Sequence, residues 1–155
     1  MLDGAAVVKD LQNMRDDGHL SDALLRRAVR SISSSDGRYD WVGVYLVGEG
    51  DELWLHNYVG EPTEHAKIPA GSGVCGKAFA TRRNANVKDV SKEPAYLAGS
   101  PDTKSELVIL IRAGDQIFGE ININSDEPAA FKDDDEIALI SIADKLAEQL
   151  AAERR

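Results

Sequence analysis

The residues best suited to chemistry lie in one glycine-rich segment, residues 68–79, which contains the only cysteine of the chain, Cys75. Gly71, Gly73 and Gly76 surround this cysteine, and glycine permits positive φ and close approach of other backbone. The segment predicts a tight loop with exposed N–H groups that leads into a short helix, an arrangement suited to an anion or a polar ligand. A glycine turn that only lets a helix cross a sheet is the simpler alternative, and on these residues alone it is preferred.

Cys75 itself has two interpretations. A lone cysteine is typically a small buried hydrophobe, whereas a thiol at the start of a helix can be stabilised as a reactive thiolate. One cysteine excludes an intramolecular disulfide and a Cys-x-x-Cys metal site. We therefore expect no metal and no cofactor.

The composition narrows the class of protein. A chain of 155 residues suits a single domain, and 27 acidic against 18 basic residues give a net charge of −9. Such a surface repels nucleic acid and anionic lipid, so we expect neither as a partner. No basic region followed by an apolar run indicates a signal peptide, and no stretch is long enough to span a membrane. A cytoplasmic location is the natural expectation.

The elements that must position these residues follow from the hydrophobic pattern. Helical spacing occurs near both ends, over residues 5–14, 22–32 and the segment after 133, whose predicted apolar stripe runs from Ile137 through Ile140 to Leu150. Between them, residues 41–47, 53–59, 85–90, 106–112 and 117–124 predict strands, mostly joined as hairpins. This order predicts an α+β fold with a mainly antiparallel sheet of five or six strands flanked by N- and C-terminal helices. We expect those helices to pack side by side and to offer a surface for a homodimer.

Four sequence blocks carry a resemblance to a known family. They are Asp-Trp-Val-Gly-Val-Tyr-Leu at 40–46, Ile-Pro-Ala-Gly-Ser-Gly-Val-Cys-Gly at 68–76, Lys-Ser-Glu-Leu at 104–107 and Phe-Gly-Glu-Ile-Asn-Ile-Asn-Ser at 118–125. Together they resemble the GAF domain family, over a core of roughly residues 20–150 of a single domain spanning 1–155. The order is most similar to stand-alone GAF proteins typified by the free methionine-(R)-sulfoxide reductases. The resemblance implies a GAF-like, or profilin-like, fold.

The resemblance also implies roles for individual residues. Cys75 matches one family cysteine, but His65 and Gly99 stand where the reductases carry two others, including the cysteine that attacks the sulfoxide. Glu106 is kept, whereas Asn122 and Asn124 replace a pair of aspartates that help to hold the substrate amine. Amides lack the negative charge that pairs with an ammonium, so these changes favour a neutral or anionic ligand.

The function that this implies is a non-enzymatic sensor of a small polar or anionic, nitrate-like metabolite. Bacterial nitrate-sensing GAF proteins, which act beside a two-component histidine kinase, are the useful comparison, and a histidine kinase or other signalling protein is the expected partner. An indole N–H and a phenol, with backbone N–H groups, could hold such an anion. The candidate ligand-binding residues are Trp41, Tyr45, His65, Ala66, Lys67, Cys75, Tyr96, Leu97, Glu106, Asn122 and Asn124.

Alternatives stay open at this point. One is a reductase of free methionine-(R)-sulfoxide that uses Cys75 with an external thiol to resolve the intermediate. Another is cyclic-nucleotide binding, which many GAF domains perform in larger signalling proteins. Among single residues, Trp41 is interpreted as core or as pocket wall, His65 as surface or as site, and Tyr96 as a cover for the core edge or a plug for the pocket.

Overall fold

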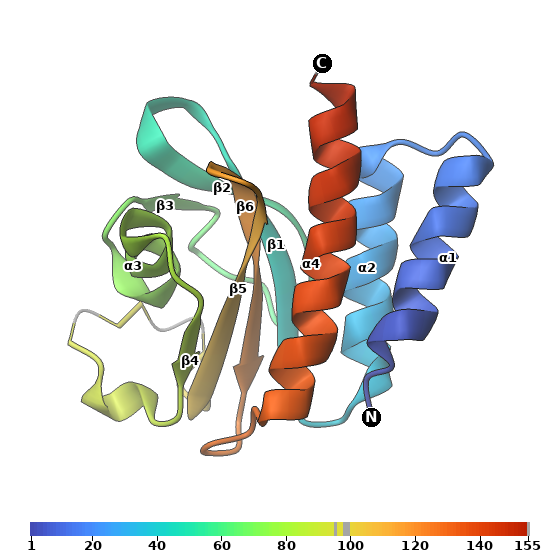
Figure 1. Cartoon of the computed structure of the whole chain (residues 1–155). Coiled ribbons are helices and arrows are strands. Elements are labelled where there is room, and N and C mark those ends of the chain that lie inside the picture. Colours follow the sequence, from blue (N-terminus) through green and yellow to red (C-terminus); the bar gives the residue numbers. More distant parts are fainter. Residues whose placement is uncertain (95, 98–99, 155) are drawn as a thin grey trace.

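A six-stranded sheet forms the centre of the part of the chain that the computed structural model describes, which is residues 1–94, 96–97 and 100–154. Its strand order is β3-β2-β1-β6-β5-β4, and every neighbouring pair is antiparallel (Figure 1). The expected α+β fold is thereby confirmed. The bounds are β1 Trp41–Val47, β2 Glu52–Val59, β3 Lys67–Pro69, β4 Ala85–Val87, β5 Ser105–Ala113 and β6 Gln116–Ser125.

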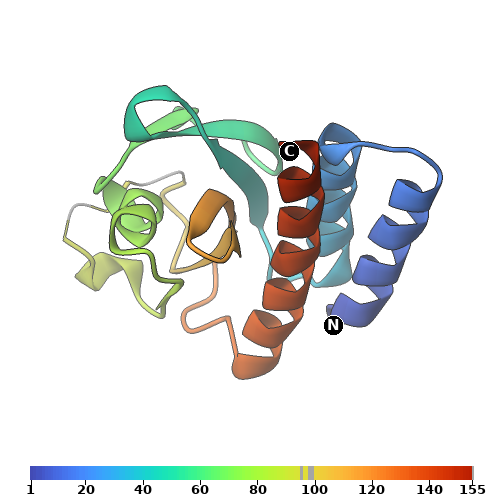
Figure 2. The same ribbon diagram turned by 45° about the horizontal axis from the view of Figure 1, so that its top comes forward.

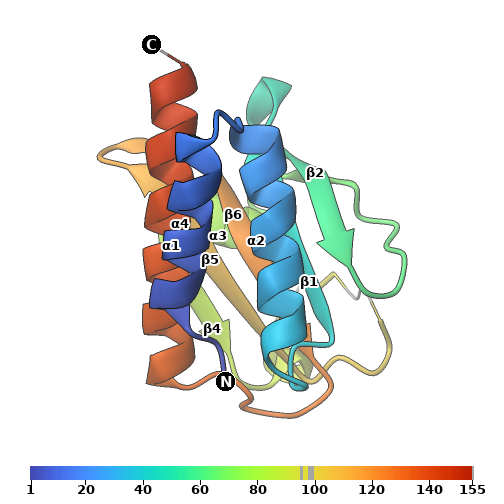
Figure 3. The ribbon, with the colours of Figure 1, turned by 90° about the vertical axis from the view of Figure 1, so that its right-hand side faces the viewer.

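The helices lie on the two faces of this sheet unequally. Three of them lie on one face, and the short helix of the glycine-rich segment packs against the other (Figures 1 and 3). The bounds are α1 Gly4–Asp16, α2 Ser21–Ser35, α3 Gly73–Thr81 and α4 Asp133–Glu153, with short 3-10 turns at Glu49–Asp51 and Val90–Lys92. None of the described helices is long and apolar enough to cross a lipid bilayer.

Alternation along the central strands explains this layering. Side chains of a strand point to opposite faces in turn, so β1, β5 and β6 each supply two sets. The set that faces α2 and α4 is aliphatic and comprises Val42, Val44, Leu107, Ile109, Ile111, Ile121 and Ile123. The opposite set packs against α3 and contains Tyr45, Val108 and Leu110, with polar residues between them. The central strands are therefore buried on both faces.

The terminal helices pack side by side, as the sequence predicts. α1 lies outside α2 and α4 and does not reach the sheet (Figure 2). An ion pair of 2.8 Å between Arg15 Nη1 and Glu148 Oε1 joins α1 to α4. A Cβ at Gly4 would lie 2.8 Å from Ser141 Oγ, so the absent side chain lets the two helices approach closely.

The predicted apolar stripe of α4 is partly wrong. Ile137 and Ile140 are 66% and 40% exposed, and the buried face instead begins at Asp135 and continues through Leu139 and Ile142. These positions follow a period of 3.6 residues from the start of the helix. Ile137 and Ile140 therefore lie on the solvent side of α4.

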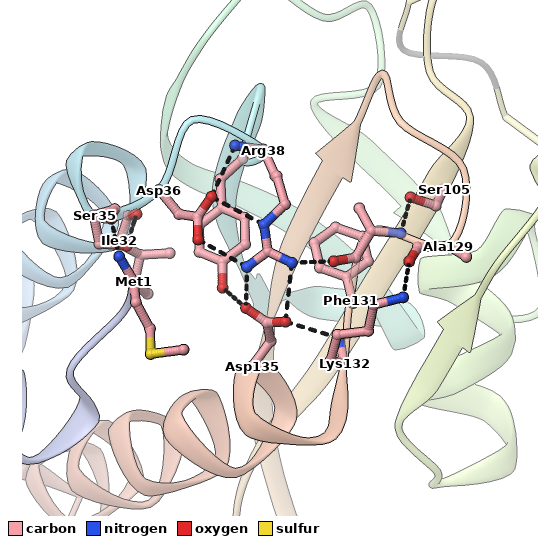
Figure 4. Close-up of polar contacts among 12 residues, drawn as sticks. Met1, Ile32, Ser35, Asp36, Arg38, Ser105, Ala129, Phe131, Lys132 and Asp135 are labelled. Atoms are coloured by element: carbon pink, nitrogen blue, oxygen red, sulfur yellow. Dashed lines mark hydrogen bonds and ion pairs between the residues drawn. The ribbon is translucent and has the colours of Figure 1, made fainter.

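A buried carboxylate fixes the start of α4 (Figure 4). Asp135 accepts hydrogen bonds from Arg38 Nη2 at 2.9 Å, from the backbone N–H of Lys132 at 2.8 Å and from the hydroxyl of Tyr39. Arg38 also donates to Asp36 at 2.7 Å, and this contact lowers the pKa of Asp36 to about 2. The network ties the loop between α2 and β1 to the last helix.

Replacing Asp135 by Ala should destabilise the fold by about 3 kcal/mol. The substitution removes a carboxylate that is only 6% exposed and that accepts hydrogen bonds from both Arg38 and Tyr39. Asp134→Ala is the matched control, since Asp134 lies in the same first turn but is exposed, and it should change stability by less than about 0.5 kcal/mol. Urea unfolding measures both values. Equal losses in the two variants would show that helix-end charge, and not the buried network, carries the effect.

Candidate functional site

A cavity of about 360 Å³ lies on the sheet face opposite the three-helix layer. Its floor comes from β1, β5 and β6, and its walls come from the start of α3, the segment after β2 and the segment before β5. The described lining residues are Asp40, Trp41, Tyr45, Gly60, Glu61, Thr63, His65, Ile68, Gly73, Val74, Cys75, Leu97, Ser100, Asp102, Thr103, Glu106, Asn122, Asn124 and Asp126.

Strand register brings the floor residues together. Asn124 of β6 pairs with Trp41 of β1 on one side and with Glu106 of β5 on the other. Two residues earlier, Asn122 pairs with Gly43. A Cβ at Gly43 would lie 2.4 Å from the ring of Trp41, so the glycine leaves room for the indole to lie over the strand.

The aromatic wall is held by bonds to backbone carbonyls. Trp41 stacks on Tyr58 with centroids 5.6 Å apart, and its Nε1–H donates to the carbonyl of Glu61 at 3.0 Å. The hydroxyl of Tyr45 donates to the carbonyl of His65 at 2.8 Å. The interpretation that the indole N–H and the phenol hold an anion is therefore wrong, because both donors already have acceptors. Both side chains line the cavity, Trp41 half-buried and Tyr45 only 2% exposed.

A hydrogen-bonded carboxyl lies at the bottom of the cavity. Glu106 is 5% exposed, and its Oε2 accepts from Asn122 Nδ2 at 2.7 Å and from the thiol of Cys75 at 3.7 Å. Asn124 Nδ2 reaches Asn122 Oδ1 at 3.5 Å. Burial raises the pKa of Glu106 to about 7, although the hydrogen bonds from Asn122 and Cys75 oppose this shift. Near neutral pH, Glu106 therefore exists as a mixture of acid and carboxylate.

Cys75 does not have the environment of a reactive thiolate. Cys75 is the second residue after Gly73 in α3, and it is 4% exposed. Burial, together with Glu120 and Glu106, raises the pKa of its thiol well above the usual value. The alternative that the helix start stabilises a thiolate is not supported, because burial of the thiol, first of all, and the neighbouring Glu120 and Glu106 raise the pKa of Cys75. The thiol stays protonated and acts as a weak donor to Glu106.

One buried acidic residue lies behind the cavity and was missed by the sequence analysis. Glu120 of β6 is fully buried, neither of its carboxyl oxygens has a hydrogen-bond partner, and burial raises its pKa well above the usual range. The strict alternation of Glu120, Asn122 and Asn124 with isoleucines could have identified it, because all three must share one face. Burial without a partner favours the protonated form of this carboxyl.

The charge of the cavity bears on the class of ligand. Four exposed acidic residues surround the mouth, one buried acid lies on the floor, and no Lys or Arg is among the described lining residues. These acids are Asp40, Glu61, Asp102, Asp126 and Glu106. The two asparagines carry no charge, but the acidic side chains around them make the cavity electrostatically unfavourable for an anion.

Eight of the eleven predicted site residues line this cavity, and three do not. Ala66 and Lys67 are exposed, and Lys67 places its Nζ 4.8 Å from the ring centroid of Trp54, away from the site. Tyr96 is half-buried and packs against the apolar cluster next to α3. Gly99, the position of the family's attacking cysteine, lies outside the described residues. Ligand binding by the eight lining residues stays a prediction.

Comparison with known proteins assigns the chain to a family. The model of the GAF domain matches residues 21–153. The chain belongs to the GAF domain family. Protein YtsP of Bacillus subtilis is 32% identical over 146 residues, which are 94% of this chain and 89% of that protein. The family match and the α+β sheet agree with the resemblance that the four sequence blocks carry.

Two solved structures share the same fold. The free methionine-R-sulfoxide reductase of Neisseria meningitidis in complex with its substrate has a TM-score of 0.88 and 29% identity, over 97% of this chain and 90% of that one. A putative GAF sensor protein of Burkholderia vietnamiensis also has a TM-score of 0.88, with 25% identity, over 98% and 96% of the two chains. This chain is thus related to both reductases and sensors.

The raised pKa of Glu106 makes stability depend on pH. Because the folded-state pKa of about 7 exceeds the ordinary 4.5, the protonated group stabilises the fold below about pH 4.5, and this contribution is lost as the pH rises through 7. The loss amounts to about 3 kcal/mol. Glu106→Gln should remove this share of the pH dependence when urea unfolding is measured at about pH 5 and about pH 8.

Glu120→Gln is the companion variant. Its gain in stability over wild type should also grow as the pH rises, because burial raises the pKa of Glu120 well above its ordinary value, whereas the gain of Glu106→Gln should level off above about pH 7. A wild-type protein whose stability is flat between about pH 5 and pH 8 would contradict the assignment of a raised pKa to Glu106.

Proposed function

We propose that this GAF domain is a binding module for a small organic cation, and that occupancy of the cavity is its signal. The observation that carries this proposal is the lining: two aromatic faces and five acidic side chains, with no Lys or Arg among the described lining residues. A cation over an aromatic face gains about 0.5 to 2 kcal/mol, more when it is desolvated. Carboxylates around the mouth raise the local concentration of cations.

This ligand class replaces the nitrate-like anion that the sequence suggested. The tryptophan and tyrosine donors that would hold an anion are bonded to the carbonyls of Glu61 and His65. An anion would also approach the exposed acids Asp40, Asp102 and Asp126, of which Asp126 already has a raised pKa through burial and repulsion by the other two. Cyclic-nucleotide binding is disfavoured for the same reason, because the phosphate would enter an acidic mouth.

A reductase is the second candidate function, and the relatives named as free methionine-R-sulfoxide reductases support it. Such chemistry would need the thiolate of Cys75 and an external thiol to resolve the oxidised product. The raised pKa of Cys75 and its burial oppose this. The sensor proposal is therefore preferred.

Signalling to a partner, such as a histidine kinase, and dimerisation through the terminal helices stay predictions. Ile137 and Ile140 form an exposed apolar surface on α4, which suits either kind of contact. Sedimentation that shows only monomer at high concentration would remove the dimer.

A thermal-shift screen tests the ligand class. Choline and ethanolamine should raise the melting temperature, whereas nitrate, cyclic AMP and 3,3-dimethyl-1-butanol, the uncharged analogue of choline, should not. At a hundredfold excess over Kd a ligand adds about 2.7 kcal/mol, a shift of several degrees in a domain of this size. A shift with nitrate and none with the cations would contradict the proposal.

The two tryptophans provide a matched pair for locating the site. Trp41→Ala should weaken choline binding about tenfold, because it removes the aromatic face that lines the cavity. Trp54→Ala should leave the affinity unchanged, because Trp54 is 40% exposed and lies outside the lining. Isothermal titration calorimetry measures both affinities. Equal weakening by the two substitutions would place the ligand elsewhere.

Cys75→Ser separates binding from reduction. A hydroxyl still donates to Glu106, so choline affinity should stay within about threefold of wild type. An assay of free methionine-(R)-sulfoxide with dithiothreitol should detect no turnover by the wild-type protein. Turnover that Cys75→Ser abolishes would overturn the preference for a sensor.

A further inference from the structure

We propose that an organic cation enters this cavity in exchange for the proton of Glu106, so that binding is coupled to proton release and its strength is set by pH. This inference rests on the proposed function, because it concerns the same cavity and the same ligand class. It adds the identity of the residue that distinguishes a cation from a neutral molecule of equal shape.

The first argument is the geometry of the Glu106 carboxyl. Both of its hydrogen bonds, from Asn122 Nδ2 and from the thiol of Cys75, end on Oε2, and Oε1 accepts none from the described residues. A proton on this carboxyl therefore belongs on Oε1, and the side chain lines the cavity. With its proton, the group is a neutral donor toward a ligand; without it, the group is a buried anion.

The second argument is that no Lys or Arg faces Glu106 in its surroundings as far as they are described. The titratable groups that face it are Cys75 from α3, Tyr45 from β1, Glu120 from β6, Glu93 and Tyr96 from the segment before β5, and the remaining acids and His65 of the cavity lining. No Lys or Arg is among them. Asn122 and Cys75 are neutral donors, so they orient the carboxylate without balancing its charge.

An unpaired buried carboxylate is costly, and this cost favours the exchange wherever Glu106 is protonated. Below about pH 7 the proton neutralises Glu106 in the empty cavity, in keeping with a pKa of about 7. When a cation binds, its charge takes over this role, and the protonated form loses its advantage. The O–H bond at Oε1 breaks, its electron pair stays on the oxygen and the proton passes to the buffer, so charge inside the cavity is conserved.

The position of Glu120 makes it a control for this mechanism. It lies on the same face of β6 as Asn122, it is fully buried, and it is not among the lining residues. Burial raises its pKa, and it does not line the cavity, so a ligand there should leave its protonation unchanged. The control variant Glu120→Gln replaces this carboxyl by an amide, which is uncharged at every pH of the experiment.

Isothermal titration with choline tests the exchange, because a quaternary ammonium has no proton of its own to release. Heats measured in phosphate and in a zwitterionic sulfonate buffer (MES for the lower pH, HEPES for the higher), whose ionisation enthalpies differ from that of phosphate, give the number of protons released. Wild type and Glu120→Gln should release close to one proton per choline at about pH 6 and about a tenth at about pH 8, with affinity rising about tenfold per pH unit below 7. In Glu106→Gln, proton release and the pH dependence should both disappear, and affinity at about pH 8 should fall at least tenfold.

The outcomes separate this inference from the proposed function. Choline that binds at the Trp41 wall with no proton release at about pH 6 would overturn the exchange and leave the cation-binding function intact. A proton release that survives in Glu106→Gln would assign the exchange to another group and also overturn the inference. Binding of the neutral analogue in place of choline would overturn the proposed function together with the exchange.

Discussion

Strands β5 and β6 are buried on both faces, and the two faces carry opposite chemistry. Toward α2 and α4 they present isoleucine and leucine, and this face supplies most of the apolar burial that stabilises the fold. Toward α3 they present Glu106, Glu120 and Asn122 among aliphatic residues. Polar groups buried there cost free energy unless they are paired or neutralised. The arrangement of the cavity follows from how this chain satisfies each of them.

The three polar groups are satisfied in different ways. Asn122 donates to Glu106 and to the carbonyl of Leu107, at 2.7 Å and 3.4 Å. Glu106 accepts this bond and faces the cavity, where a ligand can reach it. Neither carboxyl oxygen of Glu120 has a hydrogen-bond partner, and the residue does not line the cavity. Protonation is the remaining way to lower the free-energy cost of burying this carboxyl. The thiol of Cys75 lies between the two carboxyls, which explains why a residue able to form a thiolate is kept neutral.

Much of this arrangement could be predicted from alternation and turn chemistry. The pattern over residues 117–124 determines which side chains of β6 share a face, and the glycines around Cys75 indicate the tight entry to α3. Burial of Ile137 was predicted from local spacing, and a pocket role for Lys67 from the likeness to ligand-binding GAF proteins. The structure contradicts both, because tertiary packing selects which side of α4 meets the sheet and turns Lys67 toward Trp54. The acidic mouth was also beyond local patterns, since Asp40, Glu61, Asp102 and Asp126 come from four separate segments.

Because side chains alternate between the two faces of β5, adjacent residues of this strand connect the cavity to the helix layer. Glu106 faces the ligand, and the next residue, Leu107, packs in the core beneath α4. A change in the charge of Glu106 acts on a strand whose neighbouring side chain is held by that core, and close-packed cores transmit such strain. The ligand can shift the helices only by as much as its affinity differs between the two arrangements. Under the proposed exchange, the affinity of the cavity would depend on one proton, so binding would respond to two inputs, the concentration of the cation and the pH, which act on the same carboxyl.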